Sequence, residues 1–208
     1  MPEFDAILFD FDGVLIDSEP VHWACWAEVL APLGANLTWE WYRDNGIGID
    51  DREMVRIIAA GCEPRREWEH LWERYPAKRE LFRARMLEAP PFPAGLRGLL
   101  ESLRPEYKMA VVTSSGRAEI EPMLEKAGLR PFFDTLVCAR DTARHKPAPD
   151  PYLLAASRLG ARRPLVVEDS EPGLASGRAA GFEVLAVKDP AGLSELLLGR
   201  LSGPVPSG

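Results

Sequence analysis

The stretch AILFDFDG, residues 6–13, decides the fold, because four apolar residues run directly into two aspartates and a glycine. The apolar part has the length and uninterrupted character of a strand buried on both faces of a parallel sheet. Asp10 and Asp12 follow at its carboxyl end, where buried charge is costly unless a cation or hydrogen bonds compensate it. Gly13 allows the chain to turn sharply. The stretch therefore predicts a buried strand that ends in a polar site.

Four more apolar runs of strand length follow, at residues 109–112, 135–138, 164–167 and 183–187. Between them lie segments with apolar residues three and four apart, which is the spacing of a helix that buries one face. Alternation of strand and helix predicts right-handed crossovers and helices on both faces of the sheet. From residue 94 onward, the sequence therefore predicts an α/β fold with a doubly wound, Rossmann-like parallel sheet.

Residues 18–90 interrupt this alternation, since they contain helical patterns but no convincing buried strand. The stretch APPFP at residues 89–93 is typical of a stiff linker. All six tryptophans lie in the interrupting segment, and their spacing favours helix packing over substrate stacking. We expect an α/β core of residues 1–17 and 91–201, an inserted α-helical cap of residues 18–90, and a disordered tail from residue 202 to 208.

The composition argues against several classes of protein. Of the 208 residues, 46% are apolar and 27% charged, the balance of an ordinary soluble globular protein. No apolar run approaches the ~20 residues of a transmembrane helix, and the acidic start PEFD is unlike a signal peptide. The net charge of −7 comes without a basic patch, so we expect neither a nucleic-acid nor a membrane partner.

The three cysteines, Cys25, Cys62 and Cys138, are widely spaced and have no CxxC arrangement or histidine partners. Such cysteines are typical of reduced thiols in the cytoplasm, which is where we expect this protein. A helical cap beside an α/β core is compatible with a monomer, and we expect that oligomeric state.

Two further segments carry groups suited to a phosphate. Thr113 and Ser114 follow the run at 109–112, and a hydroxyl ahead of N–H groups at a helix start can cradle an anion. Lys146 precedes a proline and could supply the fixed positive charge that a phosphate needs. Taken singly, the first segment could be an ordinary helix cap and the lysine an exposed loop residue.

Glu168 and Asp169 follow the run at 164–167. Adjacent acids at the end of a buried strand are hard to explain structurally, and they suggest a hard cation such as Mg²⁺ with oxygen ligands. Because ligands bind at the carboxyl ends of strands in open α/β sheets, we expect these acids to share one site with the other polar segments.

Taken together and in this order, four stretches resemble the signature motifs of the haloacid dehalogenase superfamily. They are DFDGVLIDSE (10–19), VVTSSG (111–116), HKPAPDPY (145–152) and VVEDSEPGL (166–174). The resemblance is closest to the β-phosphoglucomutase-like branch of phosphatases and mutases, and it includes the inserted helical cap. It covers nearly the whole chain, from residue 9 to residue 181.

The resemblance implies roles for the two aspartates. Asp10 would attack phosphorus and form an aspartyl-phosphate. Asp12 would protonate the leaving oxygen and then take a proton from the hydrolytic water. The dehalogenase members of the superfamily lack the second acid of the DxD pair, so Asp12 argues for phosphorus rather than carbon–halogen chemistry.

The resemblance also assigns the remaining segments. Thr113 and Lys146, with Ser114 beside the threonine, would hold the phosphoryl oxygens, and Lys146 would offset the charge on the nucleophile. The Mg²⁺ ligands would be Asp10, the backbone carbonyl of Asp12, and Asp169. Glu168 would lie nearby or join through water.

Cap residues are implied as well. His22 matches a hinge histidine of the β-phosphoglucomutase branch and Lys78 a cap lysine, and both could reach the substrate on cap closure. By itself, Lys78 belongs to a charge run that we interpret as a solvated helix face. The mutase pattern places an arginine in this loop of the cap to hold a second phosphate. Arg52 could serve only if the alignment shifts by one residue, and two acids, Asp50 and Asp51, precede it.

Acids at that position disfavour a second phosphate, which favours hydrolysis over mutase activity. The sequence therefore predicts a Mg²⁺-dependent phosphatase acting on a small phosphorylated metabolite, such as a sugar phosphate or phosphoglycolate. One alternative is a sugar-phosphate mutase. Another is a non-catalytic phosphate-binding protein, which would have no need of Asp12.

Overall fold

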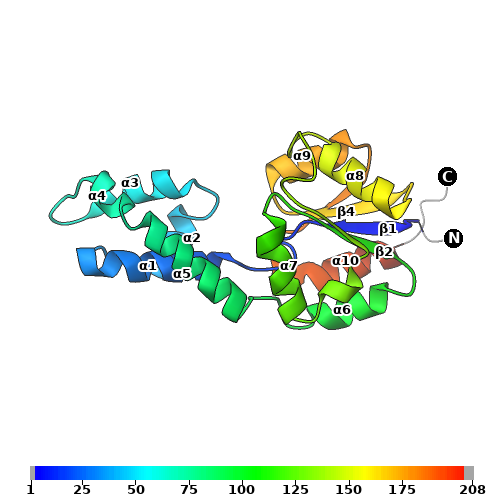
Figure 1. Ribbon diagram of the computed structural model, residues 1–208, viewed down its shortest axis with the longest axis horizontal. Coiled ribbons are helices and arrows are strands. Elements are labelled where there is room, and N and C mark those ends of the chain that lie inside the picture. Colours follow the sequence, from blue (N-terminus) through cyan, green and yellow to red (C-terminus); the bar gives the residue numbers. More distant parts are fainter. Residues whose placement is uncertain (1–2, 204–208) are drawn as a thin grey trace. The chain divides into compact units, whose positions relative to one another are not determined.

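The computed structural model describes residues 3–203, and the chain divides into two compact units (Figure 1). One unit combines the residues before Ser18 with those from Pro90 onward, and the other consists of residues 18–89. The sequence-based prediction places the second division one residue later. Of the predicted disordered tail, Ser202 is the last residue of a helix, whereas residues 204–208 lie outside the described part of the chain.

The first unit is built on a parallel sheet whose described strands follow the order β3-β2-β1-β4-β5. The strands are β1 (Ala6–Phe9), β2 (Lys108–Val112), β3 (Thr135–Val137), β4 (Pro164–Glu168) and β5 (Glu183–Ala186). Phe9, the last residue of β1, is in register with Val111 of β2 and Val167 of β4. The carboxyl ends of these three central strands therefore meet at one edge, and the predicted doubly wound sheet is confirmed.

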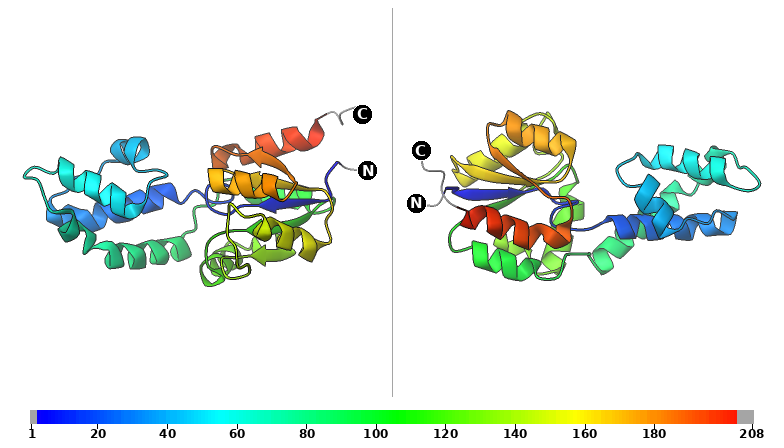
Figure 2. Two further views of the ribbon diagram at one scale, coloured as in Figure 1. Left: turned by 90° about the horizontal axis from the view of Figure 1, so that it is seen from above. Right: turned by 180° about the vertical axis from the view of Figure 1, so that it is seen from behind.

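Helices cover both faces of this sheet, as Figures 1 and 2 show: α8 and α9 lie on one face, and α6, α7 and α10 on the other. Their bounds are α6 (Leu96–Leu103), α7 (Arg117–Lys126), α8 (Asp150–Leu159), α9 (Glu171–Ala179) and α10 (Leu193–Ser202), with short 3-10 turns at Arg130–Phe132 and Pro190–Gly192. Leu96, Leu99, Leu100 and Leu103 of α6 are all buried, since their spacing puts them on one face of the helix. No helix in the described residues has the length and apolar character needed to cross a bilayer.

Strand β5 differs from the prediction. Its apolar run reads like the buried strands, yet Glu183 and Ala186 are exposed and the two residues between them are only partly covered. Among the described strands β5 lies at an edge of the sheet, beside β4, but β3 at the other edge is largely buried, so the edge position alone does not account for the exposure of β5.

The second unit is helical throughout its regular structure, with α1 (Glu19–Leu30), α2 (Trp39–Asn45), α3 (Asp51–Gly61), α4 (Trp68–Trp72), α5 (Tyr75–Glu88) and a 3-10 turn at Ala31–Leu33. Thr38 caps α2 and Asp50 caps α3, each by accepting a backbone N–H in the first turn. All six tryptophans pack in one apolar cluster with Leu30, Met54 and Leu71. Trp26 is fully buried at its centre, so the packing interpretation of the tryptophans is correct.

The chain leaves the first unit after Asp17 and re-enters it at Pro90. The backbone N–H of Asp17 donates to the carbonyl oxygen of Pro91 at 3.2 Å, so the outgoing and returning segments lie side by side within this unit.

Candidate active site

The site is built around Asp10, the residue directly after β1. Its backbone N–H donates to the carbonyl of Val167 at 2.9 Å, which continues the pairing of β1 with β4 one residue beyond the strand. The side chain is buried, with 8% of the residue exposed. A carboxylate held this deeply needs a partner of opposite charge.

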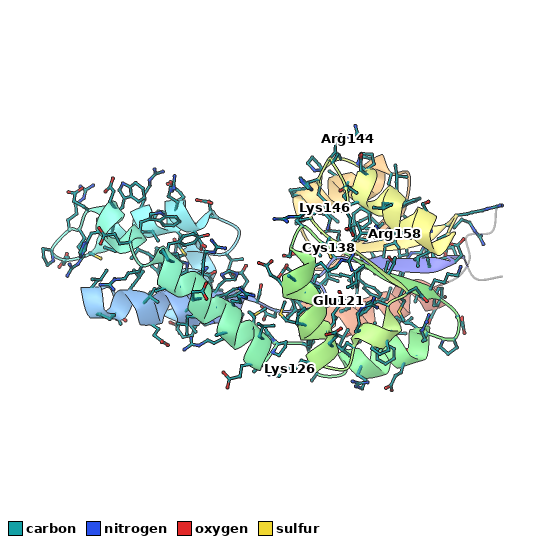
Figure 3. All side chains as sticks on the ribbon, in the orientation of Figure 1. Glu121, Lys126, Cys138, Arg144, Lys146 and Arg158 are labelled. Atoms are coloured by element: carbon teal, nitrogen blue, oxygen red, sulfur yellow. The ribbon has the colours of Figure 1, made fainter. Side chains whose placement is uncertain are left out.

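Lys146 is that partner. Its ammonium donates to Asp10 Oδ1 at 2.5 Å, to the carbonyl of Val112 at 2.9 Å and to Glu168 Oε1 at 2.6 Å. All three N–H donors of the lysine are therefore directed at the protein. Figure 3 shows Lys146 close to Cys138, which follows β3. The predicted charge-offsetting role fits this geometry, and any phosphoryl oxygen would have to share these donors.

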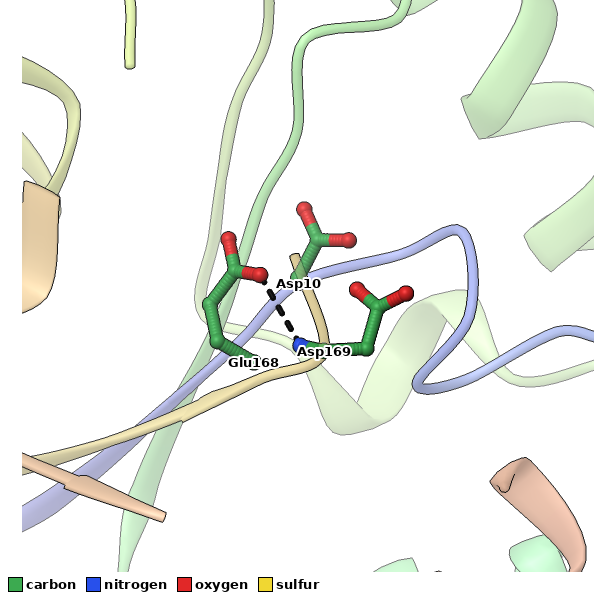
Figure 4. Close-up of side chains that lie close together, drawn as sticks. All are labelled: Asp10, Glu168 and Asp169. Carbon is green, nitrogen blue, oxygen red and sulfur yellow. Dashed lines mark hydrogen bonds between the residues drawn. The ribbon is translucent and has the colours of Figure 1, made fainter. Parts of the chain in front are cut away.

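The two acids after β4 occupy different environments. Glu168 is fully buried, whereas Asp169 is exposed. Figure 4 shows their carboxylates converging with that of Asp10, and one oxygen of each of the three lies within 4.8 Å of the others. A side chain at position 13 would collide with Asp169, since an ideal Cβ on Gly13 would lie 2.0 Å from its Oδ2. Gly13 also has a φ of 78°, so the turn and the close approach both require glycine.

The acidic cluster is short of positive charge. Burial is the main reason why the pKa of Asp10 rises to about 8; Lys146 opposes this rise and Glu168 adds to it. Although part of Asp169 is exposed, the loss of solvent around its carboxylate, and then the charge of Glu168, raise its pKa to about 6. Burial would also raise the pKa of Glu168, but Lys146 and the hydroxyl of Tyr152 outweigh it and hold that pKa below its usual range. A cation bound among these oxygens would relieve the repulsion.

The turn after β2 supplies hydroxyl groups. Thr113 is buried, and its Oγ1 accepts the backbone N–H of Ser115 at 3.0 Å. The hydroxyl of Ser115 donates to Asp12 Oδ2 at 3.1 Å. Ser114, the predicted phosphate contact, is exposed and lines a narrow pocket together with Thr113 and Lys146. The structure thus brings Asp12 to the predicted phosphate loop through a residue that the prediction leaves out.

Tyr152 of α8 is a second such residue. It is fully buried, its hydroxyl donates to Glu168 Oε1 at 2.8 Å, and its ring lies 5.1 Å from the Lys146 ammonium. The two omitted residues, Ser115 and Tyr152, lie inside the stretches VVTSSG and HKPAPDPY, so the motifs could have marked them as candidate site residues. Their partners could not be identified without the fold.

The predicted cap residues His22 and Lys78 lie together within the second unit. Lys78 Nζ is 2.8 Å from His22 Nδ1 and donates to Asp51 Oδ2 at 3.0 Å. The indole N–H of Trp26 donates to the other oxygen of Asp51 at 2.8 Å. Only 2% of Lys78 is exposed, so the interpretation of this lysine as part of a solvated face is wrong. The cause is its pairing with Asp51 and its position above the rings of Trp26 and Phe82.

Arg52 is not part of this group. Its guanidinium lies over the ring of Trp72, 5.2 Å from the centroid, and the residue is exposed.

Burial and then the adjacent ammonium of Lys78 lower the pKa of His22 to about 4, so the imidazole is neutral near pH 7. The cluster of Lys78, Asp51 and His22 therefore carries one positive and one negative charge.

Comparison with known proteins accounts for this arrangement. The chain matches the haloacid dehalogenase-like hydrolases over residues 7–187. A fructose-1-phosphate phosphatase of Escherichia coli is 32% identical, over 89% of this chain and 97% of its own length. A phosphorylated carbohydrates phosphatase of Thermotoga maritima is 30% identical, over 86% of this chain and 82% of its own length. The crystal structure of CbbY from Rhodobacter sphaeroides with phosphate superposes with a TM-score of 0.61 at 28% identity, covering 89% of this chain and 86% of the other.

The chain therefore belongs to the haloacid dehalogenase-like hydrolases, as the sequence motifs predict. Within that family it is a phosphoric monoester hydrolase.

Proposed function

We propose that this phosphatase hydrolyses a small phosphorylated carbohydrate with the help of Mg²⁺, through an aspartyl-phosphate on Asp10. The observation that carries the proposal is the buried Asp10 carboxylate, held by the Lys146 ammonium at 2.5 Å. Phosphoryl transfer depends on positioning and charge neutralisation, which this pair supplies. The named substrates of the two similar phosphatases support a carbohydrate as the group that leaves.

The oxygens of the acidic cluster fit a magnesium ion. Mg²⁺ prefers hard oxygen ligands and is usually bound by one or two carboxylates. Asp10 and Asp169 offer two carboxylates with oxygens within 4.8 Å of each other, and the absence of a side chain at Gly13 leaves room for Asp169. We propose that these two residues and the backbone carbonyl of Asp12 hold Mg²⁺, with Glu168 beside them. When bound, the ion would offset the negative charge on the phosphoryl oxygens.

The first half of the reaction uses both aspartates. Lys146 engages Oδ1 of Asp10, so Oδ2 is the oxygen that attacks phosphorus. As the new bond forms, the bond from phosphorus to the carbohydrate oxygen breaks, and that oxygen takes the proton of the Asp12 carboxylic acid. The phosphoryl group is then carried by Asp10, and Asp12 is ionised and accepts the Ser115 hydrogen bond.

The second half restores the enzyme. The Asp12 carboxylate takes a proton from a water molecule, which attacks phosphorus as the bond to Asp10 Oδ2 breaks. Inorganic phosphate leaves, Asp10 is again a carboxylate and Asp12 is again protonated. Thr113 and Ser114 lie beside Lys146, and we propose that they bind phosphoryl oxygens.

We propose that the cap cluster of His22, Lys78 and Asp51 recognises the carbohydrate. Asp51 neutralises the buried lysine, so the cluster has no net charge for a second phosphate, and its partly exposed members, Asp51 and His22, are the ones that could contact a hydroxyl. Hydroxyl groups are suited to such a cluster, whereas a bisphosphate would need an unpaired cation. We propose no role in substrate binding for Arg52, which stacks on Trp72.

We also propose that the enzyme is a cytoplasmic monomer. The described cysteines are free thiols, and two of them, Cys25 and Cys138, are buried. Light scattering of the purified protein tests the monomer directly, because a dimer would double the mass of 23.1 kDa.

The function is tested by phosphate release from a panel of phosphomonoesters, with and without Mg²⁺. The panel contains hexose 1- and 6-phosphates, glycerol phosphate, phosphoglycolate and a nucleotide. We expect Mg²⁺-dependent release from a sugar phosphate, and a loss of at least ~10³-fold in Asp10→Asn. Asp44→Asn, an equal change of charge at an exposed cap residue, is the matched control and should retain full activity.

Two outcomes would contradict the proposal. Conversion of hexose 1-phosphate to hexose 6-phosphate without free phosphate would make the protein a mutase. Phosphate binding without turnover of any substrate, unchanged in Asp12→Asn, would indicate a binding protein.

A further inference from the structure

Glu168 has an unusually complete set of hydrogen-bond donors. Oε1 accepts from Lys146 Nζ at 2.6 Å and from the Tyr152 hydroxyl at 2.8 Å. Oε2 accepts from the backbone N–H of Asp169 at 3.0 Å, and from the backbone N–H and hydroxyl of Ser170 at 3.1 and 3.2 Å. The side chain is wholly inaccessible to solvent. Its carboxylate is thus paired on both oxygens by the protein alone.

The packing around Glu168 prevents it from turning. An ideal Cβ on Gly173 of α9 would lie 1.7 Å from Oε1 of Glu168, so the carboxylate rests against the backbone of that helix. From α8, the fully buried Tyr152 donates its hydroxyl to the same oxygen. Two helices on one face of the sheet therefore fix this side chain.

A carboxylate oxygen has two lone pairs in its plane. At Glu168 Oε1, Lys146 and Tyr152 occupy both lone pairs. The oxygens of Asp10 and Asp169 nevertheless lie close enough to Glu168 for one metal ion to contact all three carboxylates. Removal of the tyrosine hydroxyl would free one lone pair and leave Glu168 more dependent on Lys146. The ammonium would then be drawn toward Glu168 and away from Asp10, the other carboxylate that it contacts.

We propose that Tyr152 is a positioning residue that, by occupying Glu168 Oε1, keeps Glu168 out of the direct ligands of the metal and leaves Lys146 shared with Asp10. The inference rests on the proposed function, because it concerns the Mg²⁺ site and the phosphate site of that reaction. Glu168 is then a fixed counter-ion to the lysine, and the metal is held by its neighbours.

The test measures two affinities in Tyr152→Phe, which removes one oxygen and keeps the ring. Metal-free protein is titrated calorimetrically with MgCl₂, and Mg²⁺-saturated protein with inorganic phosphate. We expect Mg²⁺ affinity to be unchanged within about threefold, or tighter, because the variant loses no ligand and gains a free lone pair. We expect phosphate to bind about 3–10-fold more weakly, because Lys146 moves from the nucleophile toward Glu168. Tyr107→Phe, elsewhere in the same unit, should change neither affinity.

The opposite pattern would overturn the inference. If Tyr152 oriented Glu168 as a direct ligand, its loss would weaken Mg²⁺ binding about 10–100-fold, as is usual for such supporting hydrogen bonds. Unchanged phosphate affinity in Tyr152→Phe would equally contradict it. Wild-type protein that bound no Mg²⁺ would instead refute the proposed function, before any variant is compared.

A second measurement does not depend on the folding of the variant. A crystal structure of the Mg²⁺-bound wild-type protein should show Tyr152 and Lys146 still on Glu168 Oε1. A Glu168 oxygen about 2.0–2.1 Å from the ion, the distance of direct coordination, would overturn the inference.

Discussion

Ser115 donates a hydrogen bond of 3.1 Å to Oδ2 of Asp12, although the two residues are 103 positions apart in the sequence. The bond joins the turn after β2 to the turn after β1, at the edge where the central strands end. The hydrogen bond holds the Asp12 carboxylate beside the phosphate loop predicted from the sequence.

Replacement of Ser115 by alanine should therefore affect turnover more than binding. We expect kcat to fall about 3–10-fold and KM to change less than about twofold, because the general acid loses a partner while the phosphate loop remains. Steady-state kinetics on the best sugar phosphate would measure this. Ser102→Ala removes a hydroxyl that donates to the carbonyl of Leu99 in its own helix, and it should match the wild type. A raised KM with unchanged kcat would show that Ser115 binds substrate instead.

The neighbouring acids Asp50 and Asp51 offer a matched test of the cap. Asp51 pairs with Lys78, whereas Asp50 caps α3 by accepting the N–H of Arg52. Asp51→Asn leaves the lysine without its counter-charge, so we expect kcat/KM for hexose bisphosphates to rise about 5–10-fold relative to monophosphates. Asp50→Asn removes an equal charge and retains a capping side chain, so the ratio should stay constant. Equal shifts in both variants would indicate a general charge effect.

His22 predicts a pH dependence of stability. Its folded-state pKa of about 4 lies below the usual 6.5, so the unfolded chain binds this proton first as the pH falls. The imidazole also loses its ability to accept from Lys78 when protonated. Its contribution to the free energy of unfolding is therefore complete above pH 6.5 and lost toward pH 4, up to about 3 kcal/mol.

Urea unfolding at pH 7 and pH 4.5, followed by tryptophan fluorescence, would measure this loss, since every tryptophan lies in the second unit. Acidification should destabilise the wild type by about 2–3 kcal/mol more than His22→Gln. A difference near zero would mean that the folded and unfolded states bind this proton equally, so that folding does not lower the pKa of His22.

Replacement of two helical glycines by alanine should change the stability of the protein in opposite directions. Gly173 packs on the Glu168 carboxylate, where an added Cβ has no room, whereas nothing lies within 4 Å of a Cβ at Gly98 of α6. We expect Gly173→Ala to destabilise the protein by more than about 2 kcal/mol. Gly98→Ala should stabilise it by about 0.5–1 kcal/mol through helix propensity. Thermal unfolding of both variants would decide this, and equal shifts would contradict the packing at Glu168.

The central strands were predictable because an uninterrupted apolar run of strand length indicates a strand that is buried on both faces of the sheet. Residues 6–9 are followed by acids, and a strand that ends in acids places its polar site at the sheet edge. The order of strands is a long-range property, so the run at 183–187 looks buried although β5 lies at the edge. Local sequence cannot distinguish a central strand from an edge strand of similar composition.

The candidate site was predictable residue by residue where a motif names the residue, as at Asp10 and Lys146. Partners distant in sequence were not predictable. Lys78 lies among exposed charges along α5, and its burial depends on Asp51, 27 positions away. Tyr152 reads as an ordinary apolar residue of α8, and only the fold brings its hydroxyl to Glu168.

The hydrogen bond between Asp17 and Pro91 brings the exit and return of the chain together on the surface of the catalytic unit. A segment inserted at two such closely spaced points can change in length and sequence with little effect on its host. Under the proposed function, substrate choice and phosphoryl chemistry can therefore diverge separately, one by replacement of residues 18–89 and the other by changes at the strand ends. For protein engineering, this junction is the natural place to exchange one insertion for another while retaining Asp10 and Asp12.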